Sequence, residues 1–276
     1  MTELKYKFTY DTLFKTLFVK FPRLLKRLVA ATLGIAVDSI SEFAITNPDI
    51  PPGAIGDKFC HLDITMALNG QLINLEVQVE DRKDYRERSL YHFARVYSSA
   101  LQSGSLYSSL PRVVIISIVD FLMFDCAEYR SEFRPIEVDR HELLSDKLAM
   151  LYFEVRKLPK VSDLNSELEF ILSLFRAKTE EDLNQLEALE VPVVKQAIRA
   201  YREVVVSPEF KELERLRFEA SCNEASALED AARKEREKWQ CVVADKDAAL
   251  ADRDAALADR DALIAKLLAR LGDAPR

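Results

Sequence analysis

The chain has 276 residues and a formal net charge of −7, with 49% hydrophobic and 31% charged residues, as expected of a globular protein with one core and an appendage. It contains neither a run of about 18 apolar residues nor a secretion signal, so we expect a cytoplasmic protein with no membrane partner. The four cysteines are widely spaced without a C-x-x-C pair, which argues against a disulfide framework and a zinc knuckle.

The first predicted element is an amphipathic helix from Asp11 to about Thr32, in which leucine and phenylalanine recur at helical spacing. Pro22 lies inside this span and is expected to kink or divide it. Residues 35–50 are predicted to form a strand with loops, and residues 61–80 form a predicted hairpin.

The hairpin contains the pair Asn69-Gly70, which favours the positive φ angles that a type I′ turn needs at both central residues. A two-residue turn also fixes the register, so that the numbers of opposed residues sum to 139. This register predicts one apolar face, which is expected to pack on the core. Its opposed pairs are Met66 and Ile73, Ile64 and Leu75, and Leu62 and Val77.

The other face of the hairpin is predicted to be polar, since the register places Asp63 opposite Glu76 and His61 opposite Gln78. Opposed residues have Cβ atoms about 4.5–5.5 Å apart, and two carboxylates at that separation repel each other. A bound cation relieves the repulsion. Carboxylate oxygens suit Mg²⁺ or Mn²⁺, which fill their other positions with water and substrate phosphate. The hairpin alone leaves open an alternative, an exposed edge whose acidic residues maintain solubility.

After the hairpin, a helix is predicted over 84–103, and its buried face is expected to carry Leu90, Phe93, Ala94, Tyr97 and Leu101. The nearly continuous apolar run 113–119 is typical of a central strand that is covered on both faces. Another strand is predicted over 150–155. The order α-β-β-β-α-β indicates an α/β (α+β) fold, with a mixed sheet flanked by helices.

Beyond residue 162 the patterns are helical, over 163–177, 180–190 and 192–205. Pro208 then opens a long helical run that lacks Pro and Gly up to Gly272. Within this run a seven-residue repeat places one apolar residue per repeat on a single stripe, which suggests a coiled coil. The stripe consists of Leu250, Leu257 and Ile264.

The second apolar position of each repeat is occupied by Arg253 or Arg260 instead. The sequence therefore leaves two alternatives for the tail, a loosely self-associating helix and a solitary solvated helix.

Several short motifs occur in an order that resembles a known family. They are Tyr10-Asp11-Thr12-Leu13-Phe14-Lys15-Thr16-Leu17-Phe18, Leu62-Asp63-Ile64, Leu75-Glu76-Val77-Gln78, Arg88-Ser89-Leu90-Tyr91, the strand 113–119 with Asp120-Phe121, and Leu158-Pro159-Lys160. This series resembles the PD-(D/E)XK nuclease superfamily and, within it, the nuclease-family transposases called recombination-promoting nucleases. The resemblance implies a restriction-endonuclease-like sheet and a metal-dependent phosphodiesterase.

By this resemblance, Asp63 and Glu76 are the ligands of Mg²⁺ or Mn²⁺, and Gln78 orients the attacking water or a phosphate oxygen. The superfamily pattern has Lys at position 78, although Gln is usual in the transposase-like group. Because a Gln side chain is uncharged and cannot take up a proton, the metal is expected to carry more of the catalysis. Asp11 is a further candidate carboxylate, whereas an ordinary i, i+4 salt bridge with Lys15 is the alternative.

The net charge is unevenly distributed along the chain. Residues 1–162 contain 21 basic and 21 acidic residues, whereas the remainder contains 18 basic and 25 acidic residues. A basic group directly follows the hairpin, and such residues are candidates for DNA phosphate contacts, although charged helix faces are often only solvated. The group consists of Arg82, Lys83, Arg86 and Arg88.

Three regions are expected: a PD-(D/E)XK nuclease-like catalytic domain at 1–162, a helical region at 163–207, and a long charged helix at 208–276. The leading hypothesis is a Mg²⁺- or Mn²⁺-dependent endonuclease that cuts double-stranded DNA with little sequence preference, promotes recombination and forms a homo-oligomer. The alternative is a catalytically inactive nuclease-like scaffold that acts through its helical tail in oligomerisation or partner binding. A third reading, an RNase on the same fold, differs only in its substrate.

Overall fold

The structure is a computed structural model that describes residues 2–46, 64–80, 83–101 and 104–272, with side chains up to residue 267. The chain forms two compact units, Met1–Lys211 and Glu212–Arg276. None of the described helices is long and apolar enough to span a membrane.

The first helical segment is divided at Pro22, as predicted. Helix α1 is Asp11–Lys20 and helix α2 is Pro22–Leu33. Pro22 is the first residue of α2, where its missing N–H would have no partner in any case. The second helix ends at Gly34, whose φ of 67° is the left-handed conformation that glycine adopts without strain.

In the part of the chain that the structure describes, six strands form one mixed sheet in the order β1-β2-β3-β4-β6-β5, which confirms the predicted fold class. Their bounds are β1 Phe43–Ile45, β2 Ile64–Leu68, β3 Gln71–Gln78, β4 Val113–Val119, β5 Arg130–Phe133 and β6 Leu148–Glu154. Strand β4 is parallel to both of its neighbours, β3 and β6, and every residue in it is buried, as predicted for a central strand. The short edge strand β5 was not predicted.

The hairpin of β2 and β3 has the predicted register. Ile64 faces Leu75 and Met66 faces Ile73, and these apolar pairs lie in the core. Leu68 faces the partly buried Gln71 beside the turn. At the turn, Asn69 has a φ of 46° and Gly70 a φ of 72°, as the type I′ prediction requires. The Asn69 side chain also accepts hydrogen bonds of 3.0 Å from the backbone N–H groups of Ser41 and Glu42, which attaches the turn to the segment before β1.

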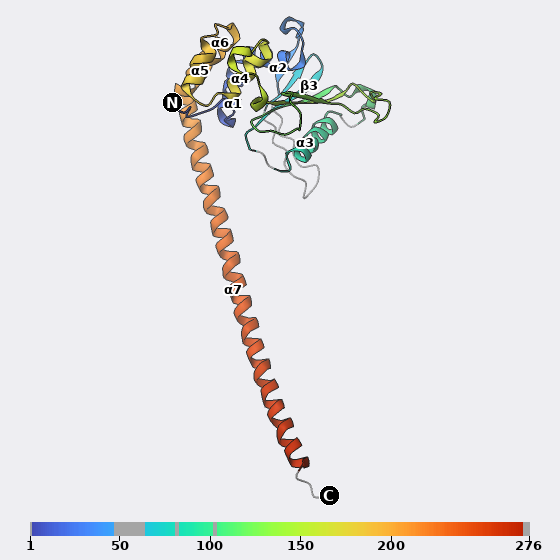
Figure 1. The fold of residues 1–276 in the computed structure, drawn as a ribbon, viewed down its shortest axis with the longest axis vertical. Coiled ribbons are helices and arrows are strands. Elements are labelled where there is room, and N and C mark those ends of the chain that lie inside the picture. Colours follow the sequence, from blue (N-terminus) through green and yellow to red (C-terminus); the bar gives the residue numbers. More distant parts are fainter. Residues whose placement is uncertain (1, 47–63, 81–82, 102–103, 273–276) are drawn as a thin grey trace. The chain divides into compact units, whose positions relative to one another are not determined.

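Helices cover both faces of the sheet (Figure 1). One face packs on a large apolar cluster with α1 and α2 and with three further helices, which are α4 Glu167–Arg176, α5 Glu180–Glu187 and α6 Pro192–Val206. Helix α3, Tyr85–Ser99, covers the opposite face through two smaller clusters around Val96 and Tyr85. Because side chains alternate along a strand, each strand supplies residues to both layers.

The three helices predicted after residue 162 are present, and their apolar residues belong to the same cluster as the first face of the sheet. Two of them begin at side-chain caps. Ser166 accepts a hydrogen bond from the Glu169 N–H, and Thr179 forms a capping box with Asp182. Short 3₁₀ turns complete the unit, at Val37–Ser39, Tyr107–Ser109, Val155–Lys157 and Val161–Asp163.

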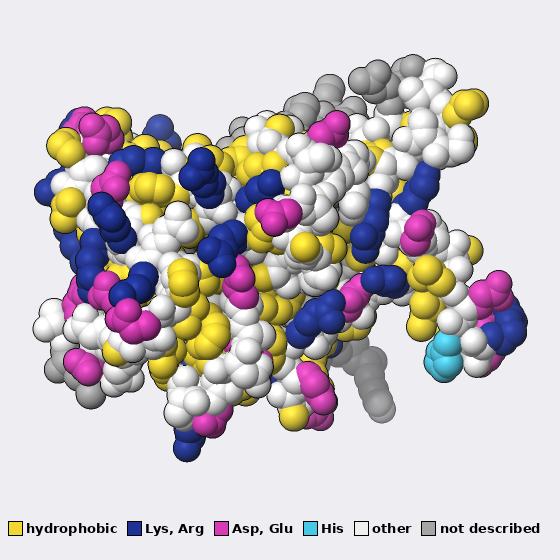
Figure 2. Space-filling view, turned by 90° about the horizontal axis from the view of Figure 1, so that it is seen from above, with side chains coloured by type: hydrophobic (Ala, Val, Ile, Leu, Met, Phe, Trp, Pro, Cys, Tyr) yellow, Lys and Arg dark blue, Asp and Glu magenta, His cyan; other side chains and the backbone are white. Residues whose placement is uncertain are grey.

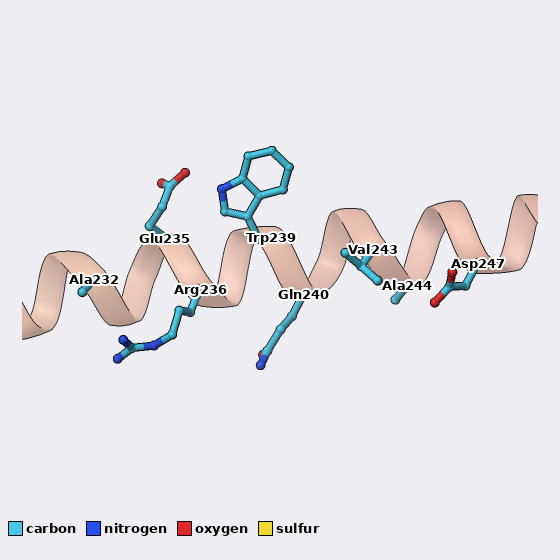
Figure 3. A pocket seen from close by; sticks show the side chains of 8 residues that line it. All are labelled: Ala232, Glu235, Arg236, Trp239, Gln240, Val243, Ala244 and Asp247. Atoms are coloured by element: carbon cyan, nitrogen blue, oxygen red, sulfur yellow. The ribbon is translucent and has the colours of Figure 1, made fainter.

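Helix α7, Pro208–Gly272, is the predicted long helix. Its first turn, up to Lys211, belongs to the first unit, where Phe210 is buried and packs edge-on against Tyr6. Beyond that point nearly every described side chain is exposed, including Trp239 and Leu257. Figure 3 shows the side chains around Trp239 projecting from a single helix, which cannot enclose a cavity by itself.

Candidate metal centre on strand β3

The polar side of β3 faces helix α3. Alternation along the strand places Ile73, Leu75 and Val77 on the apolar cluster, and it therefore places Asn74, Glu76 and Gln78 on the side of α3. Glu76 is only 7% exposed although it carries a carboxylate. Carboxylates are seldom buried to this extent unless they are paired or hydrogen-bonded.

Two side chains hydrogen-bond to the Glu76 carboxylate. Asn74 Nδ2 donates to Glu76 Oε1 over 2.8 Å, and His92 Nδ1 of α3 lies 3.0 Å from the same oxygen. An ionised carboxylate can only accept, so in that state His92 carries its proton on Nδ1. The Asn74 amide is itself held by Thr65, whose hydroxyl donates to Asn74 Oδ1 over 3.3 Å. Glu76 is therefore fixed in position by residues from β2, β3 and α3.

Further polar side chains extend from Glu76 across the sheet. Ser117 of β4 lies opposite Glu76, and Tyr152 of β6 lies opposite Ser117. Tyr152 shares a hydrogen bond of 2.7 Å with Ser89 of α3. Burial, followed by the nearby charge of Glu76, raises the pKa of the Tyr85 hydroxyl far above its ordinary value. The surroundings of Glu76 thus contain neutral hydroxyl groups.

Gln78 lies two residues beyond Glu76, and its amide is engaged at both ends. Its Oε1 accepts a hydrogen bond of 2.6 Å from Arg88 Nη2, and its Nε2 donates to the Glu80 carbonyl over 3.0 Å. The Arg88 guanidinium also lies over the Tyr85 ring, 5.0 Å from its centre. The amide of Gln78 is thereby joined to a cation from the adjacent helix.

The other residues of the predicted basic group differ in their surroundings. Arg86 donates to the Met123 carbonyl and stacks on the Phe124 ring. Lys83 is exposed and lines a hollow of about 350 Å³ together with Arg86, whereas Arg82 lies outside the described residues. On the face seen in Figure 2, lysine and arginine are interspersed with acidic and apolar side chains and form no continuous basic field.

The structure does not bring Asp11 together with Glu76. Asp11 and Lys15 form an i, i+4 ion pair of 2.9 Å on the surface of α1. The apolar residues of α1 pack in the cluster on the sheet face opposite to the Glu76 side chain. Asp63 and His61 lie outside the described residues, so the pairing of Asp63 with Glu76 stays a prediction of the register.

The described side chains fit part of a magnesium site. Within the described ranges, no group of three or more His, Cys, Asp or Glu side chains has the arrangement of a metal site. Mg²⁺ needs fewer protein ligands, because it binds one or two carboxylates and keeps several waters. The hydrogen bonds that described residues donate to Glu76 both end on Oε1, so among these residues Oε2 is left for a cation. A buried, oriented carboxylate oxygen is the hard donor that Mg²⁺ and Mn²⁺ prefer.

Four residues around Glu76 were not predicted from the sequence, namely Asn74 of β3 and Tyr85, Ser89 and His92 of α3. The prediction that the apolar residues of α3 form its buried face was wrong for Leu90, which is 57% exposed, and for Ala94, which is also exposed. The side of α3 facing the sheet instead carries Tyr85, Ser89 and His92, together with Phe93 and Val96. The available signal was the spacing of the first three, which recur at i, i+4 and i+7 on one helical face.

Comparison with protein families found a match over most of the chain. The model of a family described as PD-(D/E)XK nuclease family transposase matches residues 8–231. The match includes the whole sheet and α1 to α6, and it ends within α7. Comparisons with curated proteins and with solved structures found no similar protein.

Proposed function

The chain belongs to the PD-(D/E)XK nuclease family transposases, and from this premise we propose that it is a Mg²⁺- or Mn²⁺-dependent endonuclease. Its substrate is double-stranded DNA, which it cuts with little sequence preference, and the resulting breaks promote recombination. The observation that carries the proposal is the buried Glu76 carboxylate, which two hydrogen bonds orient and whose second oxygen is left for a metal.

In this proposal Glu76 holds the metal together with Asp63, which the hairpin register predicts to lie opposite it. When bound, the metal lowers the pKa of a coordinated water and polarises a phosphoryl oxygen. His92 and Asn74 fix the Glu76 carboxylate, and such support of a ligand typically changes metal affinity or activity by about 10–100-fold. Tyr85 and Tyr152 stay protonated beside Glu76, because burial and the Glu76 charge raise the pKa of each phenol.

The basic residues after β3 are proposed to contact the DNA backbone. Lys83 is exposed near the start of α3, and Arg86 follows on the first turn of this helix. Backbone contacts of this kind carry no sequence information, which agrees with low sequence preference. Each contact adds to the salt dependence of binding.

Helix α7 is proposed to mediate self-association. It exposes an apolar residue at each seven-residue step of the repeat, including Leu250, Leu257 and Ile264. Pairing of two such stripes would cover them. Sedimentation of the full chain over a range of concentrations tests this, and Leu257→Lys is expected to shift the chain towards monomer. A chain that is monomeric throughout would contradict the proposal.

Nicking of supercoiled plasmid in Mg²⁺ tests the catalytic proposal. We expect nicking by the wild type and none in EDTA, in Glu76→Gln or in Asp63→Asn. The matched control is Glu142→Gln, which removes a carboxylate that is exposed in the turn region before β6, and it is expected to cut normally. Cutting by Glu76→Gln at the wild-type rate would refute the assignment of the site.

The alternative, a nuclease-like scaffold without activity, makes a different prediction for the same protein. It predicts no cutting of plasmid, single-stranded DNA or RNA in either Mg²⁺ or Mn²⁺. It also predicts no binding of Mn²⁺ that depends on Glu76, which isothermal titration calorimetry measures directly. Cutting of RNA alone would identify an RNase on the same fold.

A further inference from the structure

Arg88 donates to a neutral amide that lies two residues from Glu76, whereas some arginines of the first unit pair with carboxylates. Arg156 pairs with Asp120 over 3.0 Å, and Arg202 pairs with Glu187 over 2.9 Å. Arg88 instead donates to the neutral amide of Gln78, and within the described part of the chain no carboxylate lies at ion-pair distance from it. The side chain is partly buried, and its Nε is buried without a hydrogen-bond partner.

A partly buried guanidinium with no counter-charge is unfavourable unless an anion completes its surroundings. Arginine is suited to phosphate, because its planar fork donates several hydrogen bonds to adjacent oxygens. The position of Arg88 is also specific. Its hydrogen-bond partner Gln78 is two residues from Glu76 on the same face of β3, and that spacing corresponds to about 7 Å along a strand.

The choice of glutamine at position 78 has a physical consequence. A carboxylate there would form an ion pair with Arg88 and neutralise it. An amide oxygen holds the guanidinium by a hydrogen bond and leaves its positive charge available. The Tyr85 ring, 5.0 Å from the guanidinium carbon, restrains the same group from another side without contributing an opposite charge.

We infer that Arg88 contacts a non-bridging oxygen of the scissile phosphate, and that Gln78 is the positioning residue that holds the Arg88 guanidinium without neutralising it. The inference rests on the proposed function. It changes the role expected of Gln78, which acts through Arg88 and not directly on the attacking water. The fixed guanidinium of Arg88 would then stabilise negative charge that develops on the phosphoryl oxygens.

A double-mutant cycle in the full-length protein tests the inference. Nicking kinetics in Mg²⁺ are measured for Arg88→Ala, Gln78→Ala and the double variant. We expect Arg88→Ala to lower kcat about 10²–10³-fold, as removal of one transition-state donor does. Gln78→Ala should lower kcat in the wild type but have little further effect in Arg88→Ala, because the two residues act as one unit. Losses that multiply would show that Gln78 acts independently and would overturn the inference.

Two conservative variants separate a chemical role from a structural one. Arg88→Lys keeps the positive charge but loses the planar guanidinium with its several donors, so partial nicking activity is expected. Gln78→Glu keeps the size of the side chain but neutralises Arg88, so it should be as impaired as Arg88→Ala. A Gln78→Glu variant with wild-type kcat would overturn the inference. Circular dichroism melting establishes that each variant is folded.

DNA binding supplies a readout that does not depend on turnover. Fluorescence anisotropy with a 20-bp duplex, of about two helical turns, is recorded in EDTA at several salt concentrations. Loss of one phosphate contact should reduce the slope of log K against log [salt] by about 0.9 in Arg88→Ala. The control Arg140→Ala removes an exposed arginine that pairs with Glu137 and Glu142, and it should leave the slope unchanged. An unchanged slope in Arg88→Ala would also overturn the inference.

Failure of the inference and failure of the proposed function are distinguishable. If the wild type and Arg88→Ala nick equally well while Glu76→Gln is inactive, the inference is wrong and the nuclease assignment stands. If the wild type cuts no nucleic acid in Mg²⁺ or Mn²⁺, the proposed function fails, and the inference fails with it.

Discussion

Replacement of His92 tests the support of the Glu76 carboxylate. His92→Leu removes one of the two hydrogen bonds to Glu76 Oε1 and leaves only that from Asn74. A hydrogen bond to a charged group contributes about 1.5–3 kcal/mol to stability. For a unit the size of Met1–Lys211, each kcal/mol corresponds to roughly 2–4 °C in Tm. We therefore expect the metal-free variant to melt about 3–12 °C below the wild type.

The same substitution should weaken the binding of metal. Loss of a group that orients a ligand lowers metal affinity about 10–100-fold. At saturating metal this reduces the stabilisation by Mg²⁺ or Mn²⁺ by about 1.4–2.7 kcal/mol. Urea unfolding followed by circular dichroism, with and without Mn²⁺, measures the metal-free loss and the metal-dependent loss separately.

His92→Asn is the matched variant, because its amide nitrogen is as many bonds from Cβ as His Nδ1 and can donate to Glu76 in its place. We expect it to recover most of the metal-dependent stabilisation, apart from a few tenths of a kcal/mol of helix propensity. Equal Mn²⁺-dependent stabilisation in the wild type and His92→Leu would refute the idea that His92 supports a metal ligand. Equal losses in His92→Leu and His92→Asn would show that ring packing matters and the donor does not.

Three further predictions concern the scaffold. Glu154→Gln replaces a buried carboxylate that pairs with the partly buried Lys157 over 2.7 Å. It should cost about 3–5 kcal/mol in urea unfolding, and much of this loss should be regained when Lys157 is also changed to Met. Gly70→Ala places a side chain at a φ of 72° and should lower the free energy of unfolding by about 1–2 kcal/mol because of backbone strain, since no atom lies within 4 Å of the added Cβ. A loss below about 0.5 kcal/mol in the same assay would contradict the turn assignment. Burial acts to raise the pKa of Asp182, but hydrogen bonds from the Lys178 and Thr179 N–H groups outweigh it and hold the pKa below its ordinary value. Its contribution to stability is therefore present above about pH 4 and lost as the pH falls below that value. Asp182→Asn should accordingly lose less stability than the wild type between pH 6 and pH 3.

Where local chemistry and packing agree, the sequence predicted the fold. The Asn69-Gly70 turn fixed the register of the hairpin, Pro22 divided the first helix, and the apolar run of β4 indicated a central strand. Strand β5 was not predicted because an exposed edge strand with a charged sequence, Arg130–Phe133, has no apolar alternation to reveal it. Its pairing is visible only once β6 provides the neighbouring strand.

The site was predictable only along β3. Glu76 and Gln78 could be predicted because they are polar residues on a hairpin that is otherwise apolar. The role of His92 depends instead on how α3 is rotated against the sheet. The rotation could not be read from apolar periodicity, because the face of α3 that meets the sheet is partly polar. The orientation of a helix is normally predicted by turning its apolar face towards the core, and this rule fails for a helix that packs over a polar centre.

The alternation of β3 restricts the sequence changes that this strand can accept. Glu76 lies between two residues of the apolar cluster, Leu75 and Val77. Insertion or deletion of one residue between the turn at Gly70 and Glu76 would reverse the two faces. The carboxylate would then point into the apolar layer, and Leu75 after an insertion, or Val77 after a deletion, would point at His92. Changes in length are therefore tolerable only outside this segment, so the number of residues from the turn to Glu76 is set jointly by the core and by the site.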